Sequence, residues 1–334
     1  MKPMVMLVAV WIAGCTVSPK GSIVTPSDPT TPATPPTPTG QDTCAVSRPD
    51  FGQPASAAER ALFAYDTAAP LNLTKAVESR DNGVEVSVVS FSSPDGGTVP
   101  GLLFDPTSRA GLRPGVIILP GAGGSARHMT VEAMRLAPHG AVAIAITPPN
   151  ARRSGPWRQF TIQDRTEQIQ LMKDLQRTVD VLRARPNVDP QRIAFLGISY
   201  GGTMGVQFVG LERRLKAAVL QVADGGLVTH ETGPGDGNLA GLSCGARNGW
   251  LRAMVPIEPI RFIPHASPTP LLLQNGRHDN FVPAADAELL HLAAPEPKTI
   301  RWYDAGHGLA PQAVADMHEW LHAHIGLDLL KPPS

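Results

Sequence analysis

Apolar runs and their alternation with polar residues predict the secondary structure from residue 84 onward. The strand-like runs 84–91 and 99–104 flank the turn-forming segment 92–97, which indicates an antiparallel hairpin at a sheet edge. Later runs are apolar throughout and alternate with stretches of helical apolar spacing, which is typical of a parallel sheet covered by helices on both faces. About eight strands are therefore expected in an α/β fold. The remaining strands are predicted at 115–119, 141–146, 193–196, 217–222, 270–274 and 298–303, and the helices at 126–137, 163–185, 203–211, 284–293 and 311–325.

The first residues have the pattern of a secretory signal. Lys2 precedes an apolar stretch at 4–13, which is too short to span a bilayer, and small residues lead to Cys15. Residues 12–15 resemble a bacterial lipobox, which implies that 1–14 are removed and that Cys15 carries the lipid. Thr16 stands where an inner-membrane lipoprotein would have aspartate, so the resemblance favours an outer-membrane anchor with the domain in the periplasm or at the cell surface. An ordinary signal with an incidental cysteine is the alternative.

Composition separates a tether from the rest of the chain. Residues 15–44 are rich in threonine, proline and serine and lack apolar periodicity, so we expect an extended spacer there and one catalytic domain at 45–334.

The chain has 29 basic and 29 acidic residues and 5% aromatic residues. No basic run is present, which argues against a nucleic-acid partner.

Three cysteines are present in the sequence. If Cys15 is lipidated, Cys44 and Cys244 remain as thiols of an exported protein. Two cysteines in an oxidising compartment more often pair than stay free. We therefore expect a Cys44–Cys244 disulfide between the start of the domain and the segment over the site.

The segment 197–201, Gly-Ile-Ser-Tyr-Gly, carries the most informative motif. It follows the apolar run 192–196 and precedes a helix-compatible stretch, which is the context that presents a serine nucleophile on a sharp strand-to-helix turn. The flanking glycines leave room for that turn. Asp279 and His307 also lie in turns that directly follow predicted strands, so all three side chains are expected at the carboxyl edge of the sheet.

Over residues 84–325 the chain resembles the α/β-hydrolases of the dienelactone hydrolase and bacterial esterase group. The resemblance is carried by segments 93–101, 119–124, 197–201, 275–283 and 304–308, and the chain order Ser, Asp, His is the one used by that fold. It implies an esterase that needs no cofactor or metal. The expected substrate is a small-molecule carboxylic ester.

The proposed roles follow from the chemistry of each side chain. Ser199 is the nucleophile and His307 is the general base, since an imidazole titrates near working pH. Asp279 orients the imidazole and matches the family pattern before Val282 and Pro283. Asp224 follows the preceding strand and is the competing acid.

The oxyanion hole is expected from two backbone amides. One belongs to Tyr200, directly after the nucleophile, and the other to Ala122 or Gly123 in the glycine-rich loop. Pro120 departs from the family, in which a histidine often supports this loop. A phosphate-binding loop is excluded because Gly-Lys-Ser/Thr does not follow.

One motif points to different chemistry. His318 and His322 satisfy the H-E-x-x-H pattern of zinc peptidases on a predicted helix. A catalytic zinc needs a third protein ligand, and the extended motif that would supply one fails, because Ile325 occupies the place of its glycine. No metal site is therefore expected.

Two segments should surround the substrate, and two other functions remain open. The glycine-rich insert 225–264 is expected to form a lid or pocket wall, and the loop 148–157 should rim the same edge. Arginines in or next to that loop either favour an anionic substrate or are solvated surface residues. The alternatives to an esterase are a serine peptidase resembling the prolyl oligopeptidase catalytic domain and a non-catalytic surface-binding protein. The candidate apolar contacts are Leu242, Trp250 and Met254, and the arginines are Arg152, Arg153 and Arg158.

Overall fold

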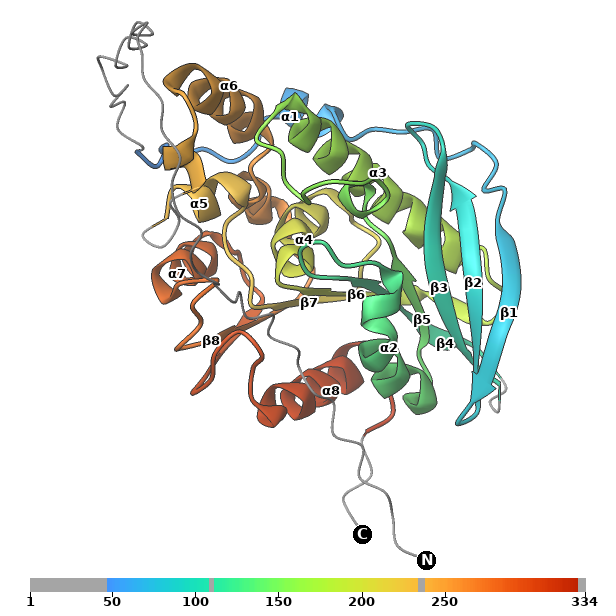
Figure 1. The fold of residues 1–334 in the computed structure, drawn as a ribbon. Helices are drawn as coiled ribbons and strands as arrows, with labels where there is room; N and C mark the ends of the chain where they lie inside the picture. Colours follow the sequence, from blue (N-terminus) through green and yellow to red (C-terminus); the bar gives the residue numbers. More distant parts are fainter. Residues whose placement is uncertain (1–46, 108–110, 234–237, 330–334) are drawn as a thin grey trace, which may run out of the picture. The chain divides into compact units, whose positions relative to one another are not determined.

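A nine-stranded sheet with strand order β1-β2-β3-β5-β4-β6-β7-β8-β9 forms the centre of the structure (Figure 1). The computed structural model describes residues 47–107, 111–233 and 238–329. Strands β4 to β9 run parallel, and β1, β2 and β3 join them through antiparallel pairings. The predicted mostly parallel α/β sheet is thereby confirmed. The strands are β1 Thr74–Asp81, β2 Val84–Ser92, β3 Thr98–Pro106, β4 Arg113–Leu119, β5 Val142–Ile146, β6 Val188–Ile198, β7 Ala217–Gln221, β8 Leu271–Gly276 and β9 Lys298–Tyr303.

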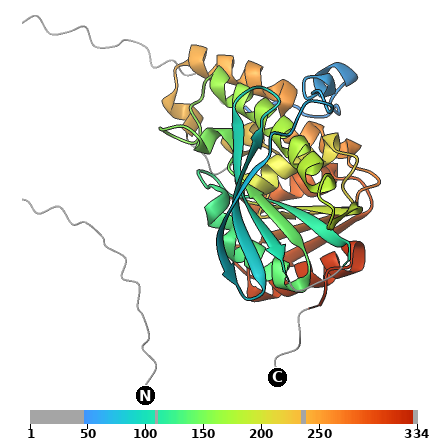
Figure 2. The same ribbon diagram turned by 90° about the vertical axis from the view of Figure 1, so that its right-hand side faces the viewer.

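Strand β1 corrects the expected strand count and the expected edge. The predicted hairpin is β2–β3, but β1 pairs with β2 and forms the outer strand, seen from outside in Figure 2. All eight residues of β1 are exposed, and the register shifts between Val77 and Ser79. Because neither face of β1 is buried, its sequence lacks the apolar alternation by which strands are recognised.

Two hydrophobic clusters show how helices cover the sheet. On β4, Ile117 belongs to one cluster and Ile118 to the other, as expected for side chains that alternate between faces. Helices α3, α4, α6 and α7 contribute to the first cluster, and α2 and α8 to the second. Figure 1 shows α2 and α8 on one side of the sheet and α3 and α4 on the other. The helices are α1 Ala57–Ala61, α2 Thr130–Leu136, α3 Ile162–Arg183, α4 Tyr200–Leu211, α5 Leu227–Glu231, α6 Cys244–Met254, α7 Ala284–Ala293 and α8 Pro311–Ile325.

The start of helix α3 is fixed by a capping box. The Thr161 hydroxyl accepts from the amide of Gln163 at 3.2 Å, and the Asp164 carboxylate accepts from the amide of Thr161 at 3.3 Å. Asp164 also accepts from Trp250 Nε1 at 2.8 Å. The same carboxylate therefore begins α3 and holds α6 against it.

None of the helices in the described ranges is long and apolar enough to cross a lipid bilayer. The expected signal segment 1–14, the tether 15–44, Cys15 and Cys44 lie outside the described residues. The lipid anchor and the Cys44–Cys244 pairing stay predictions.

Candidate active site

Ser199 occupies a sharp turn between β6 and α4. Its backbone has φ 56° and ψ −123°, a conformation that costs free energy for any residue with a Cβ and is concentrated at functional sites. A Cβ atom on Gly197 would lie 2.2 Å from the carbonyl oxygen of Gly201, and one on Gly201 would lie 2.2 Å from that of Leu119. Both glycines of the motif are therefore required for the backbone to pass through this turn.

The turns after β8 and β9 are packed against each other. A Cβ on Gly276 would lie 2.5 Å from the carbonyl oxygens of Ala305 and Gly306. The His278 amide donates to the Ala305 carbonyl at 3.0 Å. Because the two turns are hydrogen-bonded and in contact, Asp279 on one turn is fixed relative to His307 on the other.

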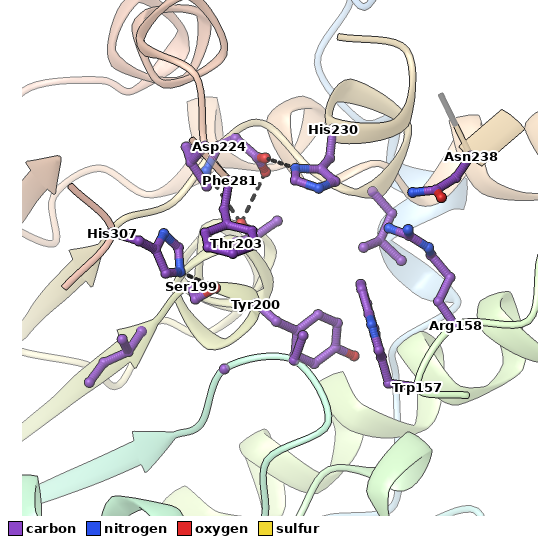
Figure 3. Close-up of a pocket in the computed structure, with 15 residues that line it drawn as sticks. Trp157, Arg158, Ser199, Tyr200, Thr203, Asp224, His230, Asn238, Phe281 and His307 are labelled. Atoms are coloured by element: carbon purple, nitrogen blue, oxygen red, sulfur yellow. Dashed lines mark hydrogen bonds and ion pairs between the residues drawn. The ribbon is translucent and has the colours of Figure 1, made fainter. Parts of the chain in front are cut away.

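A chain of two hydrogen bonds connects Ser199, His307 and Asp279. His307 Nε2 lies 2.9 Å from Ser199 Oγ, and His307 Nδ1 lies 2.7 Å from Asp279 Oδ2. Since Asp279 accepts at Nδ1, the neutral imidazole carries its proton there and presents Nε2 as an acceptor for the serine hydroxyl. Figure 3 shows His307 directed at Ser199 from the loop after β9.

Asp279 is held as a carboxylate by its surroundings. Its Oδ1 accepts from the amides of Phe281 at 2.8 Å and Val282 at 3.0 Å. Burial works against ionisation, but the hydrogen bonds from His307 and from these two amides hold the pKa of Asp279 below its usual value. The group thus stays ionised beside His307, where a negative charge stabilises an imidazolium.

Asp224, the competing acid, lies in the same cavity but bonds to a different imidazole. Its Oδ2 lies 2.9 Å from Nδ1 of His230, and its Oδ1 accepts from the Thr203 hydroxyl at 3.0 Å. It also accepts from the Gly226 amide at 3.1 Å. The structure therefore places Asp279, and not Asp224, against His307.

The glycine-rich loop after β4 approaches the serine closely. A Cβ on Gly121 would lie 3.4 Å from Ser199 Cβ, and the Gly124 amide donates to the Gly121 carbonyl at 3.0 Å. Gly121 and Ala122 line the cavity, whereas Gly123 is not among its described lining residues. Of the two loop residues that could supply the second oxyanion-hole amide, Ala122 is therefore better placed than Gly123.

A cavity of about 620 Å³ opens beside Ser199 (Figure 3). The prediction that Leu242, Trp250 and Met254 contact substrate is wrong, because these apolar residues pack into or against the hydrophobic core. The insert lines the cavity with other residues. The lining residues are Gly121, Ala122, Trp157, Arg158, Ile198, Ser199, Tyr200, Thr203, Asp224, Leu227, His230, Asn238, Phe281, Val282 and His307.

The three arginines of the rim loop all contact acidic side chains. Arg152 lies 2.8 Å from Asp174 and Arg153 lies 2.5 Å from Glu167, so both hold the loop to α3. Arg158 lines the cavity, but it contacts the buried carboxylate of Glu231 and lies over the rings of Trp157 and Phe160. The sequence left open whether these arginines bind an anionic substrate or are solvated surface residues. Neither description holds in full, because they are mainly partners in internal ion pairs.

The H-E-x-x-H motif is built into the packing of α8. His318 is buried, and this burial, followed by the nearby positive charges, lowers its pKa to about 4. His322 Nδ1 lies 2.6 Å from the carbonyl oxygen of Leu327. Within the described ranges, no three His, Cys, Asp or Glu side chains are grouped as metal ligands.

The family model of the dienelactone hydrolase family matches residues 99–320, more than half of the chain. The chain belongs to this family. The protein YfhR of Escherichia coli K12, named as uncharacterised, is 30% identical over 155 residues, which cover 45% of this chain and 49% of YfhR. The match thus spans about half the length of that relative. YuxL of Bacillus subtilis, named as an uncharacterised peptidase, is 28% identical over 145 residues, or 41% of this chain and 22% of YuxL.

Solved structures share the fold of this dienelactone hydrolase family member. An acetyl xylan esterase from Paenibacillus sp. R4 superposes with a TM-score of 0.68 at 20% identity, covering 80% of this chain and 92% of the esterase. At that identity the likeness shows the α/β-hydrolase fold alone. Family membership and esterase neighbours together support a hydrolase.

Proposed function

We propose that this protein is a serine hydrolase that cleaves carboxylic esters. The observation that carries the proposal is the chain from Ser199 Oγ through His307 to Asp279, with distances of 2.9 and 2.7 Å, on a strained strand-to-helix turn beside a cavity. A nucleophile, a base within hydrogen-bond reach and a group that orients the base are what acyl transfer through a serine requires. The resemblance to esterases supports the same reaction.

Each step follows from this geometry. Ser199 Oγ attacks the ester carbonyl carbon while His307 Nε2 takes its proton, and the imidazolium is stabilised by Asp279. His307 then gives that proton to the leaving alkoxide, and the acyl group stays on Ser199. Water next attacks the acyl carbon, with His307 as base, and the acid is released as Ser199 recovers its proton.

The negative charge on the carbonyl oxygen needs donors. The amide of Tyr200, at the start of α4, is the proposed first donor, and the amide of Ala122 in the glycine-rich loop is the proposed second donor, with Gly123 as its alternative. Loss of one such donor typically lowers kcat about 10²–10³-fold.

Hydrolysis of p-nitrophenyl esters of increasing acyl length by the full chain tests the proposal. We expect turnover that is lost in Ser199→Ala and retained in Ser79→Ala, a matched change at an exposed residue of β1. A folded protein with no ester turnover, or equal turnover in Ser199→Ala, would contradict it.

A serine peptidase is the second candidate, because YuxL is named as a peptidase. Acyl transfer to water from a peptide uses the same three side chains, so substrates and not the triad separate the two functions. The esterase proposal predicts that p-nitrophenyl esters are hydrolysed far faster than peptide p-nitroanilides after background subtraction. Peptide hydrolysis in the absence of ester turnover would favour the peptidase.

We also propose that Cys15 is lipidated, that residues 15–44 tether the domain to the outer membrane, and that Cys44 pairs with Cys244. The support is the signal-like start, the proline-rich segment and the cysteine count. Thiol labelling of the unfolded, unreduced mature protein should find no reactive thiol. Two labels per chain would contradict the disulfide.

A further inference from the structure

The cavity extends to both sides of Ser199, and the proposed reaction assigns each side a part of the substrate. Figure 3 shows His307 on one side of Ser199, and Tyr200, Trp157 and Arg158 on the other. Because His307 returns the proton to the leaving alcohol, that alcohol lies on the His307 side. The acyl group therefore extends toward Tyr200 and Trp157. This step rests on the proposed function.

The Tyr200 side chain is a buried polar group without a partner on this acyl side. It is 8% exposed and lines the cavity, and its hydroxyl forms no hydrogen bond with any side chain or backbone group of the described residues. Its ring meets that of Trp157 edge to face at 5.5 Å. Trp157 is itself held by its carbonyl oxygen, which accepts from Asn150 Nδ2 at 3.1 Å. The ring of Tyr200 thus packs against Trp157.

The oxygen of this hydroxyl is not one of the fully enclosed polar atoms that lack a hydrogen-bond partner, so a group in the cavity can reach it. Burial raises the pKa of the Tyr200 hydroxyl, so it stays protonated and can donate at any pH at which the enzyme works. The hydroxyl can therefore donate to an acceptor oxygen that the substrate supplies.

The acceptor is expected to be uncharged. Two basic side chains line the cavity, and each contacts a buried carboxylate: His230 contacts Asp224, and Arg158 contacts Glu231. The charged groups that act on Tyr200 itself are Glu167 and Asp164 and then Arg153, which is paired with Glu167. Each of these basic groups thus has a carboxylate beside it, which weakens its attraction for an anion. Desolvating an anionic acyl group in this cavity would be poorly compensated.

We propose that Tyr200 is a specificity-determining residue. Its hydroxyl donates a hydrogen bond to a neutral acceptor oxygen, such as a ketone or ether oxygen, on the acyl group of the substrate. The acyl group lies against Trp157, and its oxygen accepts the hydrogen bond from the Tyr200 hydroxyl. Substrates with the oxygen are selected over purely aliphatic ones because only they satisfy this donor.

Two matched pairs of p-nitrophenyl esters test the proposal in the full chain and in Tyr200→Phe, which removes the hydroxyl and keeps the ring and the amide. The pairs are 4-oxopentanoate with 4-methylpentanoate, and 5-oxohexanoate with 5-methylhexanoate. We expect the wild type to prefer the oxo ester in at least one pair by roughly tenfold in kcat/KM. Tyr200→Phe should abolish the preference, so that the ratio of kcat/KM for the oxo ester over the methyl ester falls to about one.

The controls separate the possible failures. Equal losses on oxo and methyl esters in Tyr200→Phe would show a merely structural role, and no preference in the wild type would overturn the inference. If neither wild type nor variant hydrolyses any ester although both are folded, the proposed function itself fails. The p-nitrophenyl ester of adipate with a free, anionic second carboxyl group should also be a poorer substrate than the same ester with that carboxyl group methylated. The reverse order would contradict a neutral acyl site.

Discussion

The cavity contains two carboxylate–imidazole pairs, Asp279–His307 and Asp224–His230. In both, a carboxylate that follows a sheet strand lies within 2.9 Å of the imidazole Nδ1. They differ in their third contact. His307 Nε2 reaches the Ser199 hydroxyl at 2.9 Å, whereas Asp224 itself accepts from the Thr203 hydroxyl with its second oxygen. In both pairs that second carboxylate oxygen also accepts from the backbone.

The difference shows that an aspartate–histidine pair in a cavity does not by itself identify a catalytic base. Asp224 fastens the start of the insert to α4, since its partners Thr203 and Gly226 belong to these two segments. Asp279 and His307 instead converge on a residue with strained backbone dihedrals. The catalytic assignment therefore depends on the nucleophile that the imidazole reaches.

The largest effects are expected at the proposed nucleophile and its proposed base. Ser199→Ala and His307→Ala should each lower kcat on p-nitrophenyl acetate by about 10³–10⁶-fold, and the double variant should be little worse than either. Residues that act as a unit give losses that do not add. Additive losses, measured by steady-state kinetics, would show that one of the two residues acts outside this unit.

Substitution of the two aspartates should then lower kcat to clearly different extents. Asp279→Asn should lower kcat by about 10²–10⁴-fold, because an amide cannot hold the same tautomer of His307 or stabilise its charge. Asp224→Asn, the matched change in the other pair, should lower it less than about tenfold and act mainly on stability. Similar losses in both variants would remove the distinction between the pairs. A larger loss in Asp224→Asn would reverse it.

A smaller, pH-dependent effect is expected at the buried Glu258, which supports the helix that carries His230. Its carboxyl accepts from the amides of Val228 at 3.0 Å and Thr229 at 2.7 Å. Burial, only partly opposed by these hydrogen bonds, raises the pKa of Glu258 to about 8. The folded state then holds a proton that the unfolded state releases above its pKa of about 4.3, so stability falls as pH rises from about 4 to 8.

Glu258→Gln should remove this slope. Denaturant unfolding at pH 5 and pH 8 should show the wild type losing about 1–3 kcal/mol more than the variant between the two pH values. Glu59→Gln is the control: Arg261 first, then Ser56, lowers the pKa of Glu59 to about 2 against the effect of burial. It is ionised in both states over this range and should leave the slope unchanged. Parallel slopes for wild type and Glu258→Gln would contradict the assignment.

The sequence predicted the parts of the molecule in which local pattern and burial agree. Strands β4 to β8 are apolar because helices cover both faces, and the elbow is recognisable because the turn tolerates only glycine at 197 and 201. Ser199, Asp279 and His307 were predicted to lie at one edge, and the structure brings them together.

The remaining features depend on tertiary contacts that leave no local pattern. Strand β1 is exposed along its whole length, so nothing in its apolar pattern marks it as a strand. Trp250 was expected in the cavity because it is apolar and lies in the insert. Instead, its indole Nε1 donates a hydrogen bond to Asp164, and its ring is buried in the hydrophobic core.

Active-site labelling tests the central claim most directly. The full chain, Ser199→Ala, His307→Ala and Asp224→Asn would each be treated with a fluorophosphonate, and the adduct located by peptide mass spectrometry. The account predicts one adduct per chain on Ser199 in the wild type and in Asp224→Asn, none at that position in Ser199→Ala, and greatly slowed labelling in His307→Ala. An adduct on another residue, or labelling that depends on Asp224 and not on His307, would contradict it.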